Sequence, residues 1–458
     1  MFLPREESEP IASIEELVDS FHGWGKPSKD WLVGAEYELI GVCTGGPGAP
    51  TAPVYAGRCG VEAIFRALAE VGWSPVWEGD HIIALSRDGA QVTLEPGGQL
   101  EHAMRPVRTA RVMEREAREF LGEITATSKD LGIAWLGVGF RPFGRLADVP
   151  WMPKARYGIM RQYLPTRGAL AHEMMKRTAT VQVNLDYSDA DDAQDKLRCL
   201  MSVTSILTAV YANSSVVDGE VAEFQSYRSF IWTDTDPDRC GLLPFVFEDG
   251  DIFRRYVDWA LDVPMFFVYR GGEHLPARGT TFRQFLTEGF DGHRATMQDW
   301  ELHLSTLFPE ARMKRFIEVR GCDAGSFSMN MSLAPLCRGL LYDETARREA
   351  TKLTEGLDMD DRVELWHAVT RSGLRARVPR TGGRVLDLAR ELVRIADDGL
   401  WRQAPDDRFY LEPLRHVVDA GRSQADVLAD MWRRAEGEPE PLVEALAYSG
   451  LGGYDARG

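Results

Sequence analysis

Acidic residues at alternate positions of a short apolar segment are the first feature of this sequence that could do chemistry. The segment GAEYELIGV, residues 34–42, has the pattern of a β-strand, so Glu36 and Glu38 point to one face while Tyr37 and Leu39 point to the other. Two carboxylates side by side repel each other unless a cation lies between them. The strand therefore predicts an acidic face that is either bathed in water or occupied by a cation.

Three further segments place polar residues on one face of a predicted strand: VTLEPGGQLE, TATVQVNLDY and FIEVRG. The first contains the tight turn Pro96-Gly97-Gly98 between its two acidic residues, and the second alternates strictly between apolar and polar residues. The polar faces are mainly carboxylate, carboxamide and arginine, and their members are Thr93, Glu95, Gln99, Glu101, Thr180, Gln182, Asn184, Asp186, Glu318 and Arg320.

Two interpretations of these polar faces are open. Antiparallel sheets commonly expose one polar face to water, and in that case these residues would be solvent-exposed surface residues without a catalytic role. However, the set has few of the Lys and Thr residues that usually cover a wet sheet, and carboxylate and carboxamide oxygens are ligands for Mg²⁺, which holds nucleotide phosphates. The second interpretation is a curved antiparallel sheet whose concave face binds Mg²⁺-nucleotide. The ligands would be Glu36, Glu38, Glu95, Glu101 and Glu318, and Arg320 would neutralise phosphoryl charge.

Arg228 lies in the segment SYRSFIWTDTDPDRCG, which is rich in turn-forming Asp, Thr and Pro. One interpretation is an N-cap or Asx-turn cluster that carries a surface arginine. The other is a loop whose arginine binds a carboxylate through two parallel hydrogen bonds. A site without a Ser, Cys or His nucleophile is compatible with phosphoryl transfer, because that reaction depends on positioning and charge compensation.

Helices and strands alternate irregularly around these segments, which predicts an α+β fold. An amphipathic helix is expected at 61–71, followed by a hairpin with strands 81–87 and 91–95 and a turn at Asp88-Gly89. Longer helices are expected near 191–211 and 383–399. No strand is followed by a glycine-rich dinucleotide fingerprint or a P-loop, so a nucleotide would bind in another way.

Composition narrows the possible partners. The 458 residues include 53 Lys plus Arg against 70 Asp plus Glu, a formal net charge of −17, which argues against nucleic acid or an anionic membrane. The N-terminus has acidic residues where a secretory signal would be basic and apolar, so a cytoplasmic protein is expected. Six scattered cysteines without CxxC pairing predict neither a disulfide framework nor a zinc site; they are Cys43, Cys59, Cys199, Cys240, Cys322 and Cys337.

Taken together, the segments resemble the plant-type glutamate–cysteine ligases, which also occur in many bacteria. The matching stretches run in family order over most of the chain, and they are GAEYELIGV, VTLEPGGQLE, PWMPKARYGIMRQYLP, MMKRTATVQVNLDY, RSFIWTDTDPDRCGLLPFVFEDG, YVDWALDVPMFFVYR, TTFRQFL, FPEARMKRFIEVRGCDAG and GLLYDE. The resemblance implies the glutamine-synthetase-like architecture, an antiparallel sheet that forms a cup for metal ions with helices packed outside. It also implies that ATP phosphorylates the glutamate side chain and that an amino group displaces the phosphate.

The resemblance also implies roles for particular residues. The metal-ligand positions of the family fall on Glu36, Glu38, Glu95, Glu101, Gln182 and Glu318. Arg320 matches the arginine that contacts phosphate, and Asn184 and Arg320 are expected to contact ATP. Arg228 matches the arginine of the substrate site, where Trp232, Thr178 and Phe266 are further expected contacts.

The chain departs from plant members on the acceptor side. Phe266 stands where they have tyrosine, and the stretch GCDAGSFSMNMSLAPLCRGLLYD lacks two arginines, a cysteine and a tryptophan that plant members have there. Met329 and Met331 are expected to make this region more apolar. The regulatory cysteines of plant members are also absent, since Glu114, Met331, Ala277 and a stretch near Glu288 occupy their positions, so plant-style thiol regulation is not expected.

These observations predict an ATP- and Mg²⁺-dependent γ-glutamyl ligase, with Mn²⁺ as a possible substitute for Mg²⁺ and L-cysteine as the acceptor. The alternative acceptor is another small apolar or unusual amino acid of specialised metabolism, for example one that bears an alkyne. A catalytically silent relative is the rival from another class, but no metal carboxylate is lost. Residues 1–458 are expected to form a single catalytic domain, active on small molecules as a monomer or small homo-oligomer.

Overall fold

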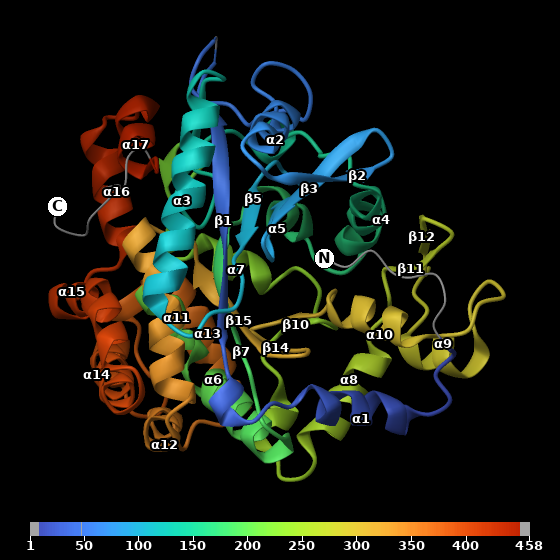
Figure 1. Ribbon diagram of the computed structural model, residues 1–458. Helices are drawn as coiled ribbons and strands as arrows, with labels where there is room; N and C mark the ends of the chain where they lie inside the picture. The colour runs from blue at the N-terminus through green and yellow to red at the C-terminus, as the bar shows by residue number, and fades with distance from the viewer. Residues whose placement is uncertain (1–8, 47, 449–458) are drawn as a thin grey trace.

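A computed structural model describes residues 9–46 and 48–448 of the chain. Its centre is a nine-stranded sheet with the strand order β14-β15-β7-β1-β5-β4-β3-β2, and β6 pairs with the far end of β1 (Figure 1). All of its pairings are antiparallel. The strands of this sheet are β1 (Val33–Cys43), β2 (Ser74–Glu78), β3 (His81–Arg87), β4 (Ala90–Leu94), β5 (Leu100–Ala103), β6 (Ile133–Leu136), β7 (Thr180–Leu185), β14 (Ala311–Met313) and β15 (Ile317–Asp323).

The register of this sheet brings the predicted polar residues onto one face. Glu36 of β1 pairs with Gln182 of β7, and Glu38 pairs with Glu101 of β5, which in turn pairs with Thr93. On the other side of β7, Asn184 pairs with Glu318 of β15. Residues paired in register point to the same side of a sheet, so the five strands β1, β4, β5, β7 and β15 contribute to a single face, called the carboxylate face below.

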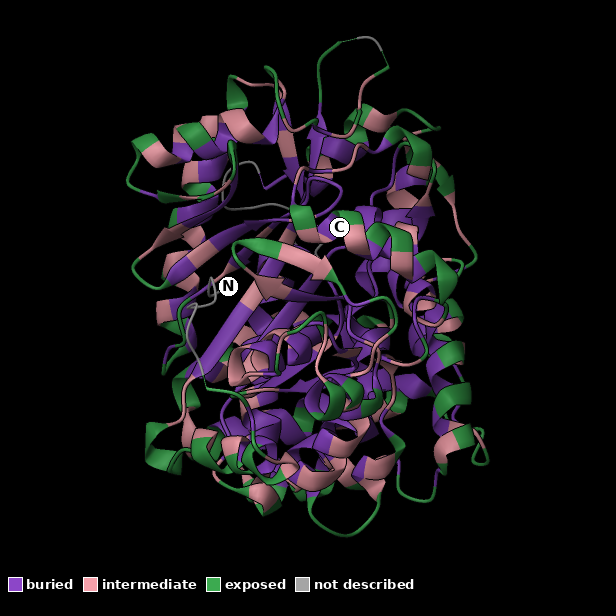
Figure 2. Ribbon diagram, turned by 90° about the vertical axis from the view of Figure 1, so that its right-hand side faces the viewer, coloured by how far each residue is buried: buried purple, intermediate pink, exposed green. Residues whose placement is uncertain are grey.

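The opposite face of the sheet is apolar and packs against helices. Tyr37, Leu39, Val181, Val183 and Val319 belong to the main hydrophobic cluster, together with residues of α6 and α11. Figure 2 shows that the strands and the helix segments against them are mostly buried, with exposed residues concentrated on the periphery. The alternation of apolar and polar residues therefore divides the sheet into a core side and a site side.

The remaining elements surround this sheet. Figure 1 shows α11 and α14 on one side of β1, and α4, α9 and α10 on the other. The helices are α1 (Ile14–Trp24), α2 (Val61–Glu70), α3 (Ala110–Lys129), α4 (Ala155–Tyr163), α5 (Ala171–Arg177), α6 (Ala190–Tyr211), α7 (Tyr227–Trp232), α8 (Ile252–Asp262), α9 (Phe282–Glu288), α10 (Met297–Leu304), α11 (Phe327–Leu341), α12 (Glu344–Lys352), α13 (Met359–Ser372), α14 (Val385–Gln403), α15 (Glu412–Ala420), α16 (Gln424–Arg434) and α17 (Pro439–Leu446). Short strand pairs are formed by β8 (Val216–Val217) with β9 (Glu220–Val221), β10 (Cys240–Gly241) with β13 (Phe308–Pro309), and β11 (Phe267–Arg270) with β12 (Glu273–Pro276). Short 3₁₀ helices lie at Ser28–Asp30, Leu146–Asp148, Leu164–Thr166, Pro244–Phe247, Gly373–Arg375 and Pro405–Leu411.

The predicted local elements are confirmed. The first helix is α2, and the hairpin of β3 and β4 turns at Asp88 and Gly89, whose φ angles of 50° and 86° give the left-handed turn that suits a two-residue hairpin. The two longer helices are α6 and α14, and α14 continues four residues beyond the expected end at 399. Within the described ranges, no helix has the length and apolar character needed to cross a bilayer.

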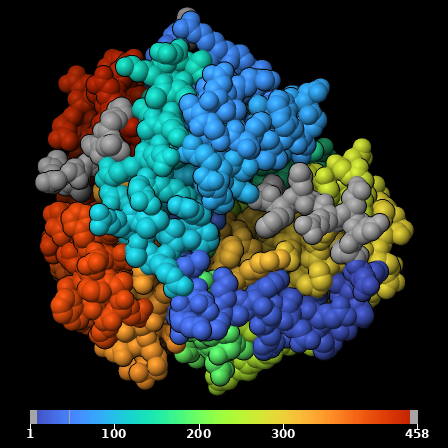
Figure 3. All heavy atoms as spheres, viewed as in Figure 1, coloured from blue at the N-terminus to red at the C-terminus, as the bar shows by residue number. Residues whose placement is uncertain are grey.

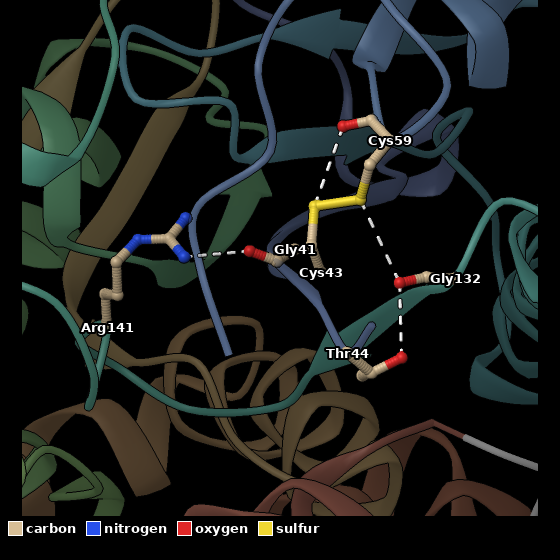
Figure 4. The surroundings of a disulfide bond; sticks show 6 residues. All are labelled: Gly41, Cys43, Thr44, Cys59, Gly132 and Arg141. Carbon is tan, nitrogen blue, oxygen red and sulfur yellow. Dashed lines mark hydrogen bonds between the residues drawn. A yellow bond between two sulfur atoms is a disulfide. The ribbon is translucent and has the colours of Figure 1, made fainter. Parts of the chain in front are cut away.

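The expectation of no disulfide is wrong, because Cys43 and Cys59 are bonded, with 6.3 Å between their Cα atoms (Figure 4). CxxC spacing is no guide to this pair, whose members are 16 positions apart. The chain folds back after β1, where the Cys43 and Thr51 backbones exchange hydrogen bonds of 2.8 and 3.2 Å. That return brings Cys59, which precedes α2 by two positions, to Cys43 at the end of β1.

Candidate active site

One end of the carboxylate face is crowded with acidic groups. The Thr93 hydroxyl lies 3.3 Å from carboxylate oxygens of both Glu95 and Glu101, and Glu38 accepts a 2.8 Å hydrogen bond from the backbone N–H of Thr180. Gln182 lies 3.5 Å from the second oxygen of Glu101. The sheet register and the Pro96-Gly97-Gly98 turn explain this convergence, because β4 and β5 return on each other and bring both ends of the turn beside β1.

Electrostatics at this acidic end oppose full ionisation. Burial and the neighbouring Glu95 raise the pKa of Glu38 to about 8, against the weaker opposing effects of Arg228 and Arg320. Burial, followed by repulsion from Glu36 and Glu95, also raises the pKa of Glu101 well above its ordinary value. The protein alone therefore leaves negative charge here uncompensated.

A divalent cation would compensate this charge, and the oxygen donors present suit Mg²⁺ or Mn²⁺. Yet no three acidic, imidazole or thiol side chains of the described segments converge closely enough to hold a metal ion. Instead, the carboxylates accept hydrogen bonds from the protein, such as those to Glu38 and Glu36. The donor chemistry fits a magnesium site, and the carboxylates would have to turn towards the ion to bind it.

The other end of the face is charge-balanced by the protein itself. Glu318 is 1% exposed and accepts a 2.5 Å hydrogen bond from Arg312, while Arg320 and Lys314 lie 3.4 and 3.7 Å away. Burial opposes ionisation of Glu318, but Arg312, Lys314 and Arg320 together outweigh it and lower the pKa of Glu318 below its usual range. Arg312 was not expected from the sequence, and its register opposite Glu318 across β14 and β15 could have revealed it.

Carboxamides connect the two ends. Asn184 donates a 2.6 Å hydrogen bond to Glu36, and Arg320 donates one of the same length to Gln182. Each of these residues points into the carboxylate face from β1, β7 or β15. The structure therefore brings together the predicted residues Glu36, Gln182, Asn184 and Arg320.

Arg228 is buried beside this face, which excludes the surface-arginine interpretation. It lies on α7, whose N-cap Ser226 accepts a hydrogen bond from Ser229, so the N-cap expectation is confirmed although the arginine is only 3% exposed. Its guanidinium donates a 2.8 Å hydrogen bond to the Arg320 carbonyl and lies 5.9 Å from the centre of the Trp232 ring. The Arg228 Nε has no hydrogen-bond partner within the described part of the chain, so the guanidinium keeps donor capacity for a ligand.

A buried carboxylate, Asp323, supports Arg228 from behind. It accepts hydrogen bonds of 2.6 Å from Ser214, 2.8 Å from Ser226 and 2.9 Å from the backbone of Asn213, and it lies 3.9 Å from the Arg228 guanidinium. Ser214 and Ser226 also bond the backbone at the start of α7. The role of Asp323 could not be predicted from the sequence, because its partners are about 100 positions away.

The other residues predicted on the substrate side lie in different parts of the structure. Phe266 is 2% exposed, packs 3.9 Å from the Arg239 guanidinium and shares a cluster with Trp232. Thr178 donates its hydroxyl to the Met174 carbonyl, 2.6 Å away, so its side chain ends helix α5. Met329 and Met331 lie in the main core, and the cluster around Phe266 does not contain them. The expectation that these methionines extend the apolar surface around Phe266 is wrong, because α11 packs on the core side of the sheet.

A further set of residues borders Glu95 from helix α4. Tyr157 donates a 2.6 Å hydrogen bond to the Leu94 carbonyl and lies 3.4 Å from Glu95, and Lys154 donates to the same carbonyl over 3.3 Å. Burial, aided by Arg156, lowers the pKa of Lys154 to about 7. These residues fall in the stretch PWMPKARYGIM, which lacks the strand alternation that marked the other site residues.

The chain thus has an α+β fold in which one face of a large antiparallel sheet carries clustered carboxylates with Arg320 beside them. Comparison with solved structures agrees: a glutamate–cysteine ligase of Francisella tularensis in complex with AMP has the same fold, with a TM-score of 0.54 at 12% identity over 90% of this chain and 87% of that one. The expected α+β cup is thereby confirmed.

The chain belongs to glutamate–cysteine ligase family 2, whose model matches residues 32–445. It is 38% identical over 446 residues to the chloroplastic glutamate–cysteine ligase of Medicago truncatula, covering 96% of this chain and 86% of that protein. The chloroplastic enzyme of Arabidopsis thaliana is 40% identical over 461 residues, covering 97% and 85%. These relatives overturn the expected cytoplasmic location, since a test for a secretory signal does not detect targeting to an organelle.

Proposed function

We propose that this protein joins the side-chain carboxylate of L-glutamate to the amino group of L-cysteine at the expense of ATP, through γ-glutamyl phosphate. The observation that supports the proposal is the sheet register, in which Glu36, Glu38, Glu101, Gln182 and Glu318 share one face. The charges of Arg228 and Arg320 act on this face. Phosphoryl transfer requires such charge compensation and positioning more than a protein nucleophile. Family membership supports the same chemistry.

In this proposal, Mg²⁺, or Mn²⁺ in its place, is held by Glu36, Glu38, Glu95, Glu101, Gln182 and Glu318. The bound cation would neutralise charge on the phosphoryl group that is transferred. Asn184 and Arg320 would contact ATP, and Arg320 would also balance phosphoryl charge. Arg320 is suited to this role because its guanidinium already faces the Gln182 and Glu318 side chains.

Arg228 would bind a carboxylate of glutamate through its planar guanidinium. Trp232 would lie against the same substrate, since both Arg228 and Arg320 approach its ring at about 6 Å. Phe266 would border the acceptor, and Thr178 would act through its backbone, since its carbonyl accepts a hydrogen bond from Gln99 near the Glu95 turn. Figure 3 shows a hollow between the light-blue segment that contains β2 and β3 and the dark-blue helix α1, with gold residues near position 300 between them.

Phe266 favours a second candidate, a γ-glutamyl ligase for a small apolar or unusual amino acid. Its ring packs among Tyr163, Phe308 and Arg239, and it offers no hydroxyl to a polar acceptor. A thiol is only weakly polar, so an apolar surface can hold cysteine and its near-isosteres. The two candidates differ in the acceptor and share all other chemistry.

A panel of acceptors tests both candidates, with glutamate and ATP present and with phosphate release and product mass as readouts. We expect cysteine and 2-aminobutyrate to react with kcat/KM values within about 200-fold of each other, because an apolar pocket discriminates weakly. Serine should be poor, since its hydroxyl must be desolvated. A cysteine preference above about 1,000-fold would contradict the apolar acceptor surface, a preference for propargylglycine would favour the second candidate, and no product with any acceptor would favour a silent relative.

Residues 1–458 would form one catalytic domain that acts on small molecules as a monomer or small homo-oligomer. Light scattering of the purified chain would measure the oligomeric state. Titration of phosphate release against protein concentration would show whether activity depends on assembly.

A further inference from the structure

Strand β15 contains a β-bulge at Arg320, and the bulge directs this arginine at the carboxylate face. The register of β15 against β7 shifts between Val319 and Cys322. Arg320 and Gly321 therefore lie opposite a single residue of β7, Gln182. A bulge of this kind turns a side chain to a new direction. Here the Arg320 guanidinium donates its 2.6 Å hydrogen bond to Gln182.

The same bulge also positions Arg228. The Arg228 guanidinium donates its 2.8 Å hydrogen bond to the Arg320 carbonyl, and the Thr180 hydroxyl lies 3.3 Å from that carbonyl. A shift of the bulge would therefore move both arginines that the proposed function uses. The residues that fix the bulge thus determine where these two guanidinium groups lie.

Glu310 lies against the bulge from the segment between β13 and β14, and it is 7% exposed. Its carbonyl accepts a 3.1 Å hydrogen bond from the Arg320 N–H, and its own N–H donates a 3.0 Å hydrogen bond to the Gly241 carbonyl. One oxygen of its carboxyl group accepts a 2.8 Å hydrogen bond from the hydroxyl of Thr204 on α6. Both the backbone and the side chain of Glu310 are therefore fixed beside the bulge.

Gly321 leaves the space that the Glu310 side chain occupies. A Cβ atom at position 321 would overlap the Glu310 oxygen that bonds Thr204, and it would lie 2.9 Å from the Thr204 hydroxyl oxygen. A side chain at 321 and the Glu310 carboxyl group thus exclude each other. Glu310, Thr204 and the glycine of the bulge therefore fit together as one unit.

The charges of both arginines reach Glu310. Burial raises the pKa of Glu310, whereas the Thr204 hydroxyl, Arg228 and Arg320 oppose this rise. Coulomb interactions are mutual, so an ionised Glu310 also attracts both guanidinium groups. Neither the metal ligands nor the substrate contacts of the proposed function include Glu310.

We propose that Glu310 is a positioning residue of the ligase: together with Thr204 and Gly321, it fixes the bulge that directs Arg320 at the phosphoryl group and Arg228 at glutamate. This inference rests on the proposed ligase function and goes beyond it, because it connects the phosphate side and the glutamate side of the site through one backbone feature. A defect in this unit should therefore change kcat and KM for glutamate together.

Thr204→Val tests the proposal, because valine has nearly the shape of threonine but lacks the hydroxyl that bonds Glu310. Initial rates of phosphate release are measured with glutamate varied at saturating ATP and acceptor. We expect kcat to fall about tenfold and KM for glutamate to rise about fivefold, since small displacements of positioned groups slow a reaction strongly. Thr204→Ser keeps the hydroxyl and loses a methyl group, so it should restore both parameters. A role in packing alone would give the reverse order, with serine the more harmful substitution.

Thr354→Val is the matched control. Thr354 is also buried, and it donates its hydroxyl to the backbone of α6, to the Ser202 carbonyl 2.9 Å away. Its hydroxyl also accepts a hydrogen bond from Arg362, so its partners lie away from the bulge. This variant should lower the unfolding temperature and leave kcat and KM for glutamate unchanged. A fall in kcat equal to that of Thr204→Val would contradict a specific role of the bulge.

Glu310→Ala completes a double-mutant cycle with Thr204→Val. Because the two residues act as one unit in this proposal, the double variant should be no slower than Glu310→Ala alone, whereas additive losses would show that they act independently. Thermal unfolding of every variant shows which of them fold. If Glu310→Ala does not fold, the comparison of valine and serine at position 204 decides, since both keep Glu310 in the chain.

The outcomes separate two failures. If wild-type enzyme forms no γ-glutamyl product with any acceptor, the proposed function is wrong. If product forms but Thr204→Val keeps the wild-type kcat and KM for glutamate, or if Thr204→Ser is impaired as much as Thr204→Val, Glu310 is not a positioning residue.

Discussion

The two ends of the carboxylate face differ in how the negative charge of their carboxylates is balanced. At one end, Glu318 is buried but surrounded by Arg312, Lys314 and Arg320, so its charge is balanced within the fold. At the other end, Glu38 and Glu101 are half-buried beside further carboxylates, and the protein supplies too little positive charge to keep them ionised. One sheet face therefore holds a structural ion cluster and an acidic cluster within a few residues of each other.

The difference separates stability from function. A buried carboxylate with three cationic neighbours contributes to the folded state, because removal of one partner leaves the others buried and unpaired. Carboxylates that repel each other destabilise the empty protein, and such an arrangement is maintained where a cation is to be bound. Equivalent substitutions at the two ends should thus both lower activity, but only the substitution at the Glu318 end should also lower stability.

The largest expected effect comes from Glu38→Gln and Glu318→Gln compared side by side. Both should lower kcat at least about 100-fold, as expected for loss of a preorganised electrostatic contact in phosphoryl transfer. Only Glu318→Gln should also lower the free energy of unfolding, by about 3–5 kcal/mol, because it leaves Arg312 without its anionic partner. Steady-state kinetics and chemical denaturation of the two variants measure both quantities; equal stability of the two would remove the distinction between the ends.

Magnesium should stabilise the protein in a pH-dependent manner. The raised pKa values of Glu38 and Glu101 contribute stability below about pH 4.5, and without metal that stability is lost as the pH rises towards about 8. Mg²⁺ binds ionised carboxylates, so its stabilising effect should be larger at pH 8.5 than at pH 6 and reach about 2.7 kcal/mol at 100 times its Kd. Thermal unfolding with Mg²⁺ or EDTA measures this, with Glu101→Gln as the variant that should lose most of the difference. A Mg²⁺ effect independent of pH would contradict the assignment.

Arg228 and Asp323 provide a third test of the acidic end. The Arg228 guanidinium opposes the raised pKa of Glu38 more strongly than Arg320 does, and Asp323 lies 3.9 Å from that guanidinium. Arg228→Lys should raise KM for glutamate about 10- to 100-fold with KM for ATP little changed, since an ammonium cannot form the planar two-pronged contact. Asp323→Asn should produce the same pattern at about a tenth of the size, because it loosens Arg228 without removing it. Initial-rate kinetics with each substrate varied provide the readout; if Asp323→Asn changed kcat alone, Asp323 would not act through Arg228.

Much of this site was predictable from the sequence because strand periodicity is local. Alternation assigned Glu36, Glu38, Gln182, Asn184, Glu318 and Arg320 to one face of their strands, and the register confirms that these strands lie side by side. The hairpin of β3 and β4 and helices α2, α6 and α14 followed from turn residues and apolar spacing in the same way. The roles of these residues stay predictions.

Partners distant along the chain were not predictable. Asp323 meets Ser214 and Ser226 across about 100 positions, and Lys154 meets Leu94 across 60. Met329 and Met331 were misplaced because a helix at the edge of a site can turn its apolar residues towards the core. The disulfide was missed for the same reason, since only the return of the chain after β1 brings Cys59 to Cys43.

The disulfide gives the smallest expected effect on catalysis and tests whether the carboxylate face depends on the end of β1. The bond joins Cys43 to Cys59 across 16 positions, and a loop of that length contributes about 3 kcal/mol of stability by restricting the unfolded chain. Cys59→Ser should therefore lower the denaturation midpoint, while kcat changes less than about twofold, because Glu38 and Glu101 are held by sheet pairing independent of the bond.

Cys240→Ser, which removes a partly exposed free cysteine, is the control. The measurements are urea unfolding, kinetics and mapping of alkylated cysteines by mass spectrometry. If reduction abolished activity while the fold persisted, the loop would have to act on the Glu95 turn, since the Pro53 carbonyl lies near Gly98 of that turn.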